Sequence, residues 1–169
     1  MKSFFLLLTA ALITLSGCTK NESVSAPEID NLSWNKQIAA AYVHSYATAI
    51  GEAALKLSND STLIDFIRKS INPISFYADS SGYFYVYDYN CVNIAHARQK
   101  DIEGQNLYDY TDTKGKYVVR ELAVKAQSGG GYVEFYWIKP GETGEKKKLG
   151  YVEPIPNTNY FIGSGVYLE

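Results

Sequence analysis

The sequence is poor in the residues that build disulfide frameworks and metal sites. It contains two cysteines, Cys18 and Cys91, and two histidines, His44 and His96, among 169 residues. A disulfide scaffold needs several paired cysteines, and a zinc site needs cysteines and histidines clustered at short spacings. Neither pattern occurs in the sequence. We therefore expect no disulfide framework, no metal centre and no cofactor.

Long runs of one charge and the common catalytic motifs are also missing. The 16 basic residues are nearly balanced by 18 acidic ones, for a formal net charge of -2. Nucleic-acid binding needs a basic stripe, so nucleic acid is excluded as the main partner. The glycines at 163–165 lack the spacing of a nucleophile elbow, and those at 129–131 lack that of a phosphate-binding loop. An enzyme, whether hydrolase or redox, is accordingly the least favoured class.

No apolar run reaches the roughly 20 residues that a membrane-spanning helix needs. The N-terminal apolar run at residues 4–15 is shorter and follows Lys2, as in a signal peptide. The next motif, LSGC at residues 15–18, resembles the bacterial lipobox, in which cleavage precedes a lipidated cysteine. We expect a signal peptide at 1–17, a lipidated Cys18 and a polar tether at 18–33. The alternative is an ordinary secretory signal followed by a chance cysteine.

Tyrosine is the abundant residue, at 15 positions, and 46% of the chain is hydrophobic. Tyrosine carries a large apolar ring and one hydroxyl, so it suits surfaces that are both apolar and polar. The length fits one domain, which we expect to span residues 34–169.

Hydrophobic periodicity predicts an α+β fold. A long helix is expected over residues 35–60, with Ser33 as its cap, and a shorter one between Ser61 and Pro73. A hairpin of two strands is expected next, at 82–97, and a helix follows it at 116–127. Three further strands are expected at 132–138, 149–155 and 160–169. The lysines at 146–148 read as part of a solvated loop. The economical arrangement is a five-stranded antiparallel sheet with the long N-terminal helix packed against it.

Aromatic residues recur at alternate positions of the predicted strands, and alternate residues share one face. If these faces coincide, they form a hollow of rings with a few polar tips, which suits a small organic acid. The candidate ligand-binding residues are Tyr85, Tyr87, His96, Trp137, Lys139 and Tyr151. In the alternative interpretation the rings are plain core and Lys139 is a solvated loop residue. Three further candidate partners for a carboxylate are Arg68, Arg98 and Arg120.

Several segments together resemble the single Cache domain, the extracytoplasmic sensor module of bacterial chemoreceptors and sensor kinases. They are GYFYVYD, IAHA, EGQNL, KGKYVVRELAVKAQSGGGYVEFYWIKPG, KLGYV and YFIGSGVYLE, in this order over residues 82–169. The resemblance implies a PAS-like sheet with N-terminal helices. Two positions depart from the family pattern: Ala97 stands where proline is usual, and Cys91 stands where glycine is usual. The hairpin turn at Cys91 is therefore expected to differ in backbone shape.

The resemblance also implies a function, since single Cache domains commonly bind short carboxylates or amino acids. We expect a stand-alone, lipid-anchored sensor in the cell envelope that binds such a ligand and communicates with a membrane receptor or kinase. Thr19 is not the aspartate by which some bacteria retain lipoproteins in the inner membrane, which favours the outer membrane. The alternative is an envelope protein–protein interaction module whose hollow is filled by its own side chains.

Overall fold

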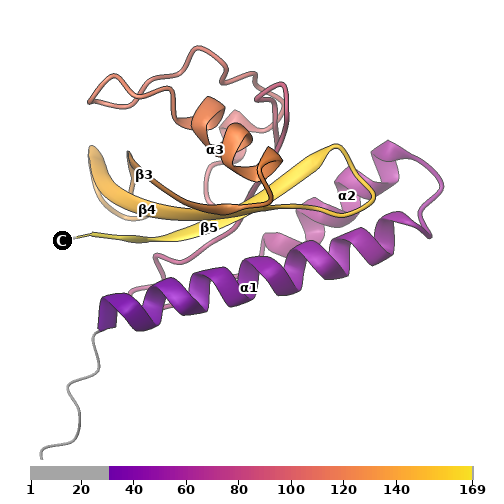
Figure 1. The fold of residues 1–169 in the computed structure, drawn as a ribbon, viewed down its shortest axis with the longest axis horizontal. Helices are drawn as coiled ribbons and strands as arrows, with labels where there is room; N and C mark the ends of the chain where they lie inside the picture. Colours follow the sequence, from indigo (N-terminus) through magenta and orange to yellow (C-terminus); the bar gives the residue numbers. More distant parts are fainter. Residues whose placement is uncertain (1–30, 169) are drawn as a thin grey trace, which may run out of the picture.

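The structure is a computed structural model that describes residues 31–168 (Figure 1). The predicted signal peptide, the lipidated Cys18 and most of the predicted tether lie outside the described residues. Within residues 31–168, no helix combines the length and the apolar character needed to cross a bilayer.

Two helices precede the sheet, α1 (Asn31–Ala54) and α2 (Asp60–Ile71). α1 begins earlier than predicted, so Ser33 lies inside its first turn, and the last three residues of the predicted tether are helical. Its buried residues include Ala39, Val43 and Ala47, spaced four apart, and these small side chains let the helix lie close to the sheet. α2 begins after Asn59, whose side chain accepts a hydrogen bond from the Thr62 N–H and so caps the helix.

The sheet confirms the predicted fold class. Its five strands are antiparallel and lie in the order β2-β1-β5-β4-β3. Their bounds are β1 (Tyr85–Asp88), β2 (Asn93–His96), β3 (Gly131–Ile138), β4 (Glu145–Pro154) and β5 (Tyr160–Tyr167). The last strand of the sequence thus lies in the middle of the sheet, and the long C-terminal strands are joined by short loops.

Helices cover the two faces of the sheet unequally (Figure 1). α1 runs along one face and contacts β4 and β5. The other face is covered by α3 (Val118–Gln127) and by the segment that leads to it, which includes the short 3-10 helix η1 (Lys100–Ile102). Each central strand therefore has one row of side chains facing α1 and one row facing α3.

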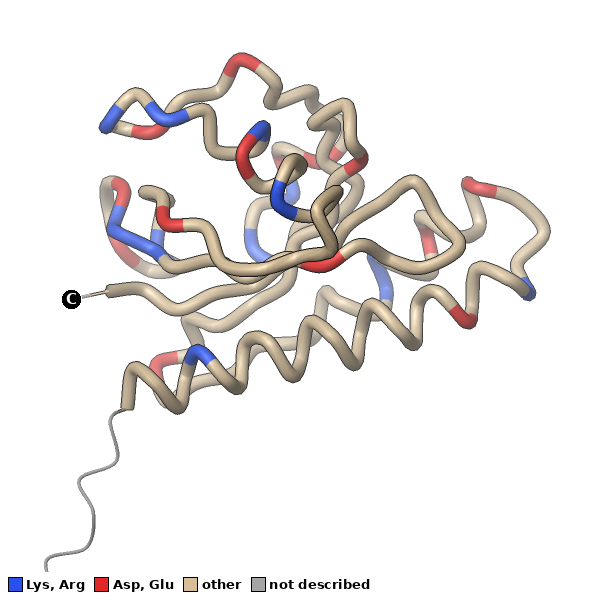
Figure 2. The backbone as a smooth tube through the Cα atoms, in the orientation of Figure 1, with Lys and Arg blue, Asp and Glu red and all other residues tan. Residues whose placement is uncertain are grey.

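β4 begins earlier than predicted, and this corrects the reading of its lysines. Lys146, Lys147 and Lys148 belong to the strand and not to a solvated loop. Lys148 pairs with Phe135 on β3 and with Tyr167 on β5, and it is fully buried. Figure 2 shows the other basic and acidic residues interspersed along the backbone, with both signs on the same loops.

The hairpin turn keeps the backbone shape that glycine would favour, contrary to expectation. Cys91 has a φ of 68°, in the left-handed region. Its N–H donates to the Asp88 carbonyl, and the Asp88 carboxylate accepts the N–H groups of Asn90 and Val92. These bonds hold the turn in a conformation that is unusual for cysteine.

The two ends of the described chain lie at the same end of the molecule. In Figure 1 the start of α1 and the end of β5 are found together at the left. Asn31 and Leu32 line one surface depression together with Tyr167 and Leu168. The first residues of α1 therefore lie beside the end of the C-terminal strand.

Candidate functional site

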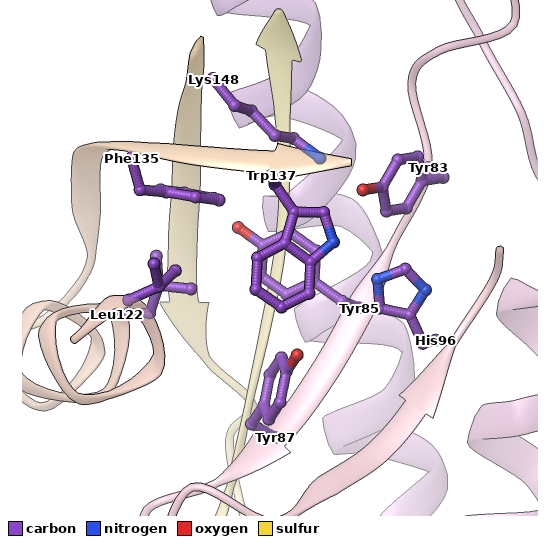
Figure 3. Close-up of a pocket in the computed structure, with 9 residues that line it drawn as sticks. Tyr83, Tyr85, Tyr87, His96, Leu122, Phe135, Trp137 and Lys148 are labelled. Carbon is purple, nitrogen blue, oxygen red and sulfur yellow. The ribbon is translucent and has the colours of Figure 1, made fainter. Parts of the chain in front are cut away.

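A small cavity lies between the sheet and α3 (Figure 3). Four strands and α3 contribute to its wall, and its free volume is about 10 Å³, close to the space of one water molecule. The lining residues are Tyr83, Tyr85, Tyr87, His96, Val118, Leu122, Phe135, Trp137 and Lys148. In Figure 3 the aromatic rings surround one space, and the Lys148 side chain reaches in from β4.

Four of the six predicted ligand-binding residues lie on this cavity. They are Tyr85, Tyr87, His96 and Trp137. Tyr85 is directly opposite His96 in the β1–β2 pair, which explains why these two side chains share a face. Whether the four residues contact a ligand stays a prediction.

Lys139 lies outside the cavity, and this corrects its predicted position. β3 ends at Ile138, so the alternation that places Phe135 and Trp137 on the inner face does not continue to Lys139. Its Nζ forms ion pairs with Asp79 at 3.1 Å and with Glu142 at 3.2 Å. Hydrogen bonds to these two carboxylates raise the pKa of Lys139, so its charge is already compensated at the surface.

Tyr151 also lies away from the cavity, on the α1 face of the sheet. On β4 the inward row contains Lys148 and Gly150, so Tyr151 points to the opposite side. Its hydroxyl donates to Glu153 at 2.7 Å, and the same carboxylate contacts His44 of α1 at 3.0 Å. The expectation that Tyr151 shares the hollow with Trp137 is therefore wrong, because β4 presents the other set of alternate residues there.

Lys148 occupies the place in the cavity that was assigned to Lys139 and Tyr151. Its Nζ lies 3.8 Å from the ring centre of Tyr83, 4.7 Å from that of Tyr167 and 5.5 Å from that of Tyr85. Within residues 31–168, Lys146 and Lys147 of β4 form ion pairs, but Lys148 forms none. Burial lowers the pKa of Lys148 well below its usual value. A lysine amine without a counter-charge thus stands among aromatic rings.

His96 is a neutral imidazole whose tautomer follows from its hydrogen bonds. Its Nδ1 accepts the backbone N–H groups of Gln99 at 2.9 Å and Arg98 at 3.2 Å. An accepting Nδ1 carries no proton, so the hydrogen of the neutral ring is on Nε2. Burial and the nearby charges of Lys148, Lys100 and Arg98 hold the pKa of His96 well below its usual value. His96 can therefore donate one hydrogen bond through Nε2 without carrying charge.

The tyrosine hydroxyls differ in what they can offer to a ligand. The Tyr167 hydroxyl donates to the Ile138 carbonyl at 2.6 Å, so Tyr83 must be the donor in its 3.0 Å contact with Tyr167. Tyr85 has a long contact of 3.4 Å to the Ser164 carbonyl. Tyr87 is opposite Asn93, a buried amide whose nitrogen and oxygen both lack hydrogen-bond partners among the described residues. Of the three cavity tyrosines, Tyr83 is thus the one whose proton is firmly engaged.

The segment before α3 closes the cavity on one side. The Trp137 indole N–H donates to the Gln99 side chain at 2.7 Å, so it is not a free polar tip as the sequence suggested. The Tyr110 ring packs edge-on against Trp137, with ring centres 5.1 Å apart. Asp112 fixes this segment to β3 by accepting the Tyr136 N–H at 2.9 Å. This segment therefore covers part of the cavity-bearing face of the sheet.

The three arginines considered as carboxylate partners are engaged elsewhere. Arg68 bonds to the Ile94 carbonyl and lies 3.4 Å from Glu103. Arg98 bonds to the carbonyls of Ala97 and Ile74. Arg120 is stacked between two exposed tyrosine rings and paired with Asp109. Lys148 is therefore the one basic side chain among the cavity-lining residues.

The cavity combines one amine, one neutral N–H donor and apolar walls. Val118 and Leu122 of α3 face Phe135 and Trp137 of β3, and they provide the apolar part. No aspartate or glutamate is among the lining residues. Within residues 31–168, no group of acidic, histidine and cysteine side chains is arranged to hold a metal ion. The arrangement is suited to binding an anion with a small apolar body.

Comparison with known proteins places this geometry in a family. The model of the family described as Cache domain matches residues 31–169. The sensor histidine kinase MctS of Rhizobium johnstonii is 41% identical over 88 residues, which cover 52% of this chain and 19% of the kinase. The chain therefore spans less than a fifth of the length of that relative.

Solved structures agree with the family match in fold. A methyl-accepting chemotaxis protein from Vibrio parahaemolyticus has a TM-score of 0.72 and 29% identity, with 82% of this chain and 92% of that chain covered. A Cache chemosensory domain described for carboxylic acid recognition has a TM-score of 0.69 and 26% identity, with 77% and 91% covered. Both are similar to this protein over nearly the whole of their own chains.

Proposed function

The chain belongs to the Cache domain family of ligand-binding sensor modules, and from this premise we propose that it binds a short monocarboxylate. The ligand would enter the cavity between the sheet and α3. Its carboxylate would face Lys148 and the Nε2–H of His96, and its carbon chain would lie against Phe135, Trp137 and Leu122. Cache domains are binding modules without catalytic activity, so recognition of the acid is the whole of the chemistry.

The observation that carries this proposal is the unpaired Lys148. Burying a basic group without a counter-charge is unfavourable by several kcal/mol, so such a group is rare unless a partner arrives from outside. A bound carboxylate would supply that partner and form charge-assisted hydrogen bonds in a site shielded from water. The carboxylic acid recognition described for a structurally similar Cache domain supports the same ligand class.

The charges of the cavity favour monocarboxylates over amino acids and dicarboxylates. An amino acid would bring a second, positive group, and no lining carboxylate is present to accept it. A dicarboxylate would bring a second negative charge, while Lys148 is the one basic residue of the lining. In either case one charge of the ligand would be buried without a partner, at a cost of several kcal/mol.

Thermal unfolding with a panel of acids tests the proposal. We expect acetate or propionate to raise the melting temperature of the purified protein, since a ligand at a hundredfold excess over its Kd stabilises by about 2.7 kcal/mol. Glycine, which matches propionate in size, and oxalate, which is only slightly larger, each bring one extra charge, and we expect little effect from either. A shift with glycine but not with acetate would contradict the assignment.

The small free volume favours a second candidate function. At about 10 Å³ the cavity is nearly filled by its own side chains, as expected for an interaction module without a ligand. For an acid to bind, side chains or the segment over Trp137 must move apart, which is also how a sensor would report binding. If no acid in the panel raises the melting temperature, the interaction module becomes the better description.

We also propose that the protein is lipid-anchored in the cell envelope through Cys18 and communicates with a membrane receptor or kinase. The LSGC motif supports the anchor, and both ends of the described domain lie at one end of the molecule, so an anchored domain would have its opposite end free. Cys18→Ser is expected to move the protein from the membrane fraction to the soluble envelope fraction. An unchanged distribution, or a mass without the lipid in the unaltered protein, would reject the anchor.

A further inference from the structure

The surroundings of Lys148 determine which protonation state the free protein can hold. The side chain is fully buried on β4, and the residues around it are Tyr83 just before β1, Tyr85 on β1, Tyr167 on β5 and Phe135 on β3. Within residues 31–168, no carboxylate forms an ion pair with its amine. An ammonium ion in such a place loses its hydration and gains only the attraction of aromatic ring faces.

A bound carboxylate would stabilise the ammonium form of Lys148 over the neutral amine. Resting on the proposed function, we propose that acid binding takes up one proton from solution, which converts Lys148 from a neutral amine into the ammonium that pairs with the ligand. In the free protein, burial without a carboxylate partner favours the neutral amine over the ammonium. The balanced reaction is that R–COO⁻, H⁺ and the –NH₂ group of Lys148 combine to give R–COO⁻ paired with –NH₃⁺ in the complex. No other bond forms or breaks, and the proton comes from the solvent.

The other titratable groups around Lys148 do not obscure this exchange. Burial raises the pKa values of Tyr83, Tyr85 and Tyr167 above their usual value, so these hydroxyls stay neutral below pH 10. Burial and nearby positive charges keep His96 neutral. The groups that β3 and α3 present to the cavity are apolar, among them Phe135 and Leu122. A proton taken up between about pH 7 and about pH 9 therefore belongs to Lys148 or to the acid itself.

The consequence for sensing is that the protein responds to the carboxylate and to protons together. Its affinity for the acid falls as the pH rises, because the free protein must first acquire a proton. When uptake is complete, the Kd rises by about tenfold for each pH unit. A given concentration of acid would thus be detected more readily in an acidified surrounding than in an alkaline one.

Titration calorimetry of the full chain with acetate or propionate measures the proton directly. Binding is followed at about pH 8 in buffers with different ionisation enthalpies, and the slope of the observed enthalpy against the buffer enthalpy counts the protons. We expect about one proton taken up. The matched control is Lys147→Met, the neighbouring β4 lysine, which is paired with Glu134 at the surface and should leave the slope unchanged.

A second measurement identifies where the proton resides. The ε-carbon resonance of Lys148 in protein with labelled lysine, assigned by its loss in Lys148→Met, is expected to move from the amine to the ammonium position when acid is added.

If acid binds with a zero slope and an unchanged resonance, the proton inference is overturned and the proposed function stands. If the slope is one but the resonance stays at the amine position, the acid binds in its neutral form and the role given to Lys148 is wrong. If no acid binds, the proposed function and this inference fall together.

Discussion

Lys148→Met is expected to weaken acid binding strongly and, at the same time, to make the free protein more stable. Removing one partner of a buried charge pair weakens binding by about 2–5 kcal/mol, which is about 30-fold or more in Kd. Methionine has a length similar to that of lysine and no group that needs hydration, so it fits the apolar surroundings. We expect the free energy of unfolding to rise by about 1–3 kcal/mol at neutral pH. Calorimetry with propionate and urea unfolding measure the two effects.

The sign of the pH dependence makes this prediction more specific. The pKa of Lys148 is lowered by folding, so the unfolded chain binds more protons than the folded one, and stability rises with pH through the window below pH 10.5. The increase in the free energy of unfolding caused by Lys148→Met should therefore become smaller as the pH approaches 10.5. Lys147→Met, on the same strand but ion-paired with Glu134, should change neither binding nor this pH dependence. A destabilised Lys148→Met variant that still binds propionate would contradict the assignment of the site.

Gly163→Ala is expected to disturb both the fold and the site, because the IGSGVY segment has room only for glycine there. A Cβ at Gly163 would lie 2.4 Å, 2.6 Å and 2.7 Å from three atoms of the buried Tyr85 side chain. Real contacts of this kind are longer, so the ring or the strand must shift. Overpacking of this kind lowers the free energy of unfolding by about 1–3 kcal/mol. Urea unfolding measures the loss, and acid binding should weaken because Tyr85 lines the cavity.

A double-mutant cycle separates this steric cause from a general weakening of β5. Tyr85→Leu removes the ring that Gly163→Ala would strike, and it leaves space of its own. The double variant is then expected to be clearly more stable than the sum of the two single losses implies. Additive losses would show that the clash with Tyr85 is not the reason that glycine is needed at this position.

Within the site, sequence reasoning succeeded where strand alternation was sufficient. Tyr85 and Tyr87 lie on one face of β1, and Trp137 shares a face with Phe135, as the period of two requires. His96 was placed correctly because it returns along the hairpin opposite Tyr85. These relationships depend on local geometry and on a hairpin between neighbouring segments, which a sequence pattern can express.

The errors in the predicted site arose where the end of a strand or the register between two strands had to be known. A run of three lysines is typical of a solvated loop, and no local signal shows that β4 starts at Glu145 and includes them. Once the strand is extended, pairing with β3 and β5 decides that Lys148 points inward and Tyr151 outward. Lys139 was misplaced for the complementary reason, because β3 ends one residue before it.

The order of the elements, the α+β class and the aromatic face of the first hairpin were determined by the sequence itself, through periodicity, turn residues and the segments that resemble the Cache family. The identity of the buried base was decided only by the tertiary structure. Periodicity states which residues share a face, but the face that meets α3 and the neighbour that fills it depend on contacts between distant strands. Those contacts bury one lysine of three beneath tyrosine rings, and they leave its neighbours at the surface.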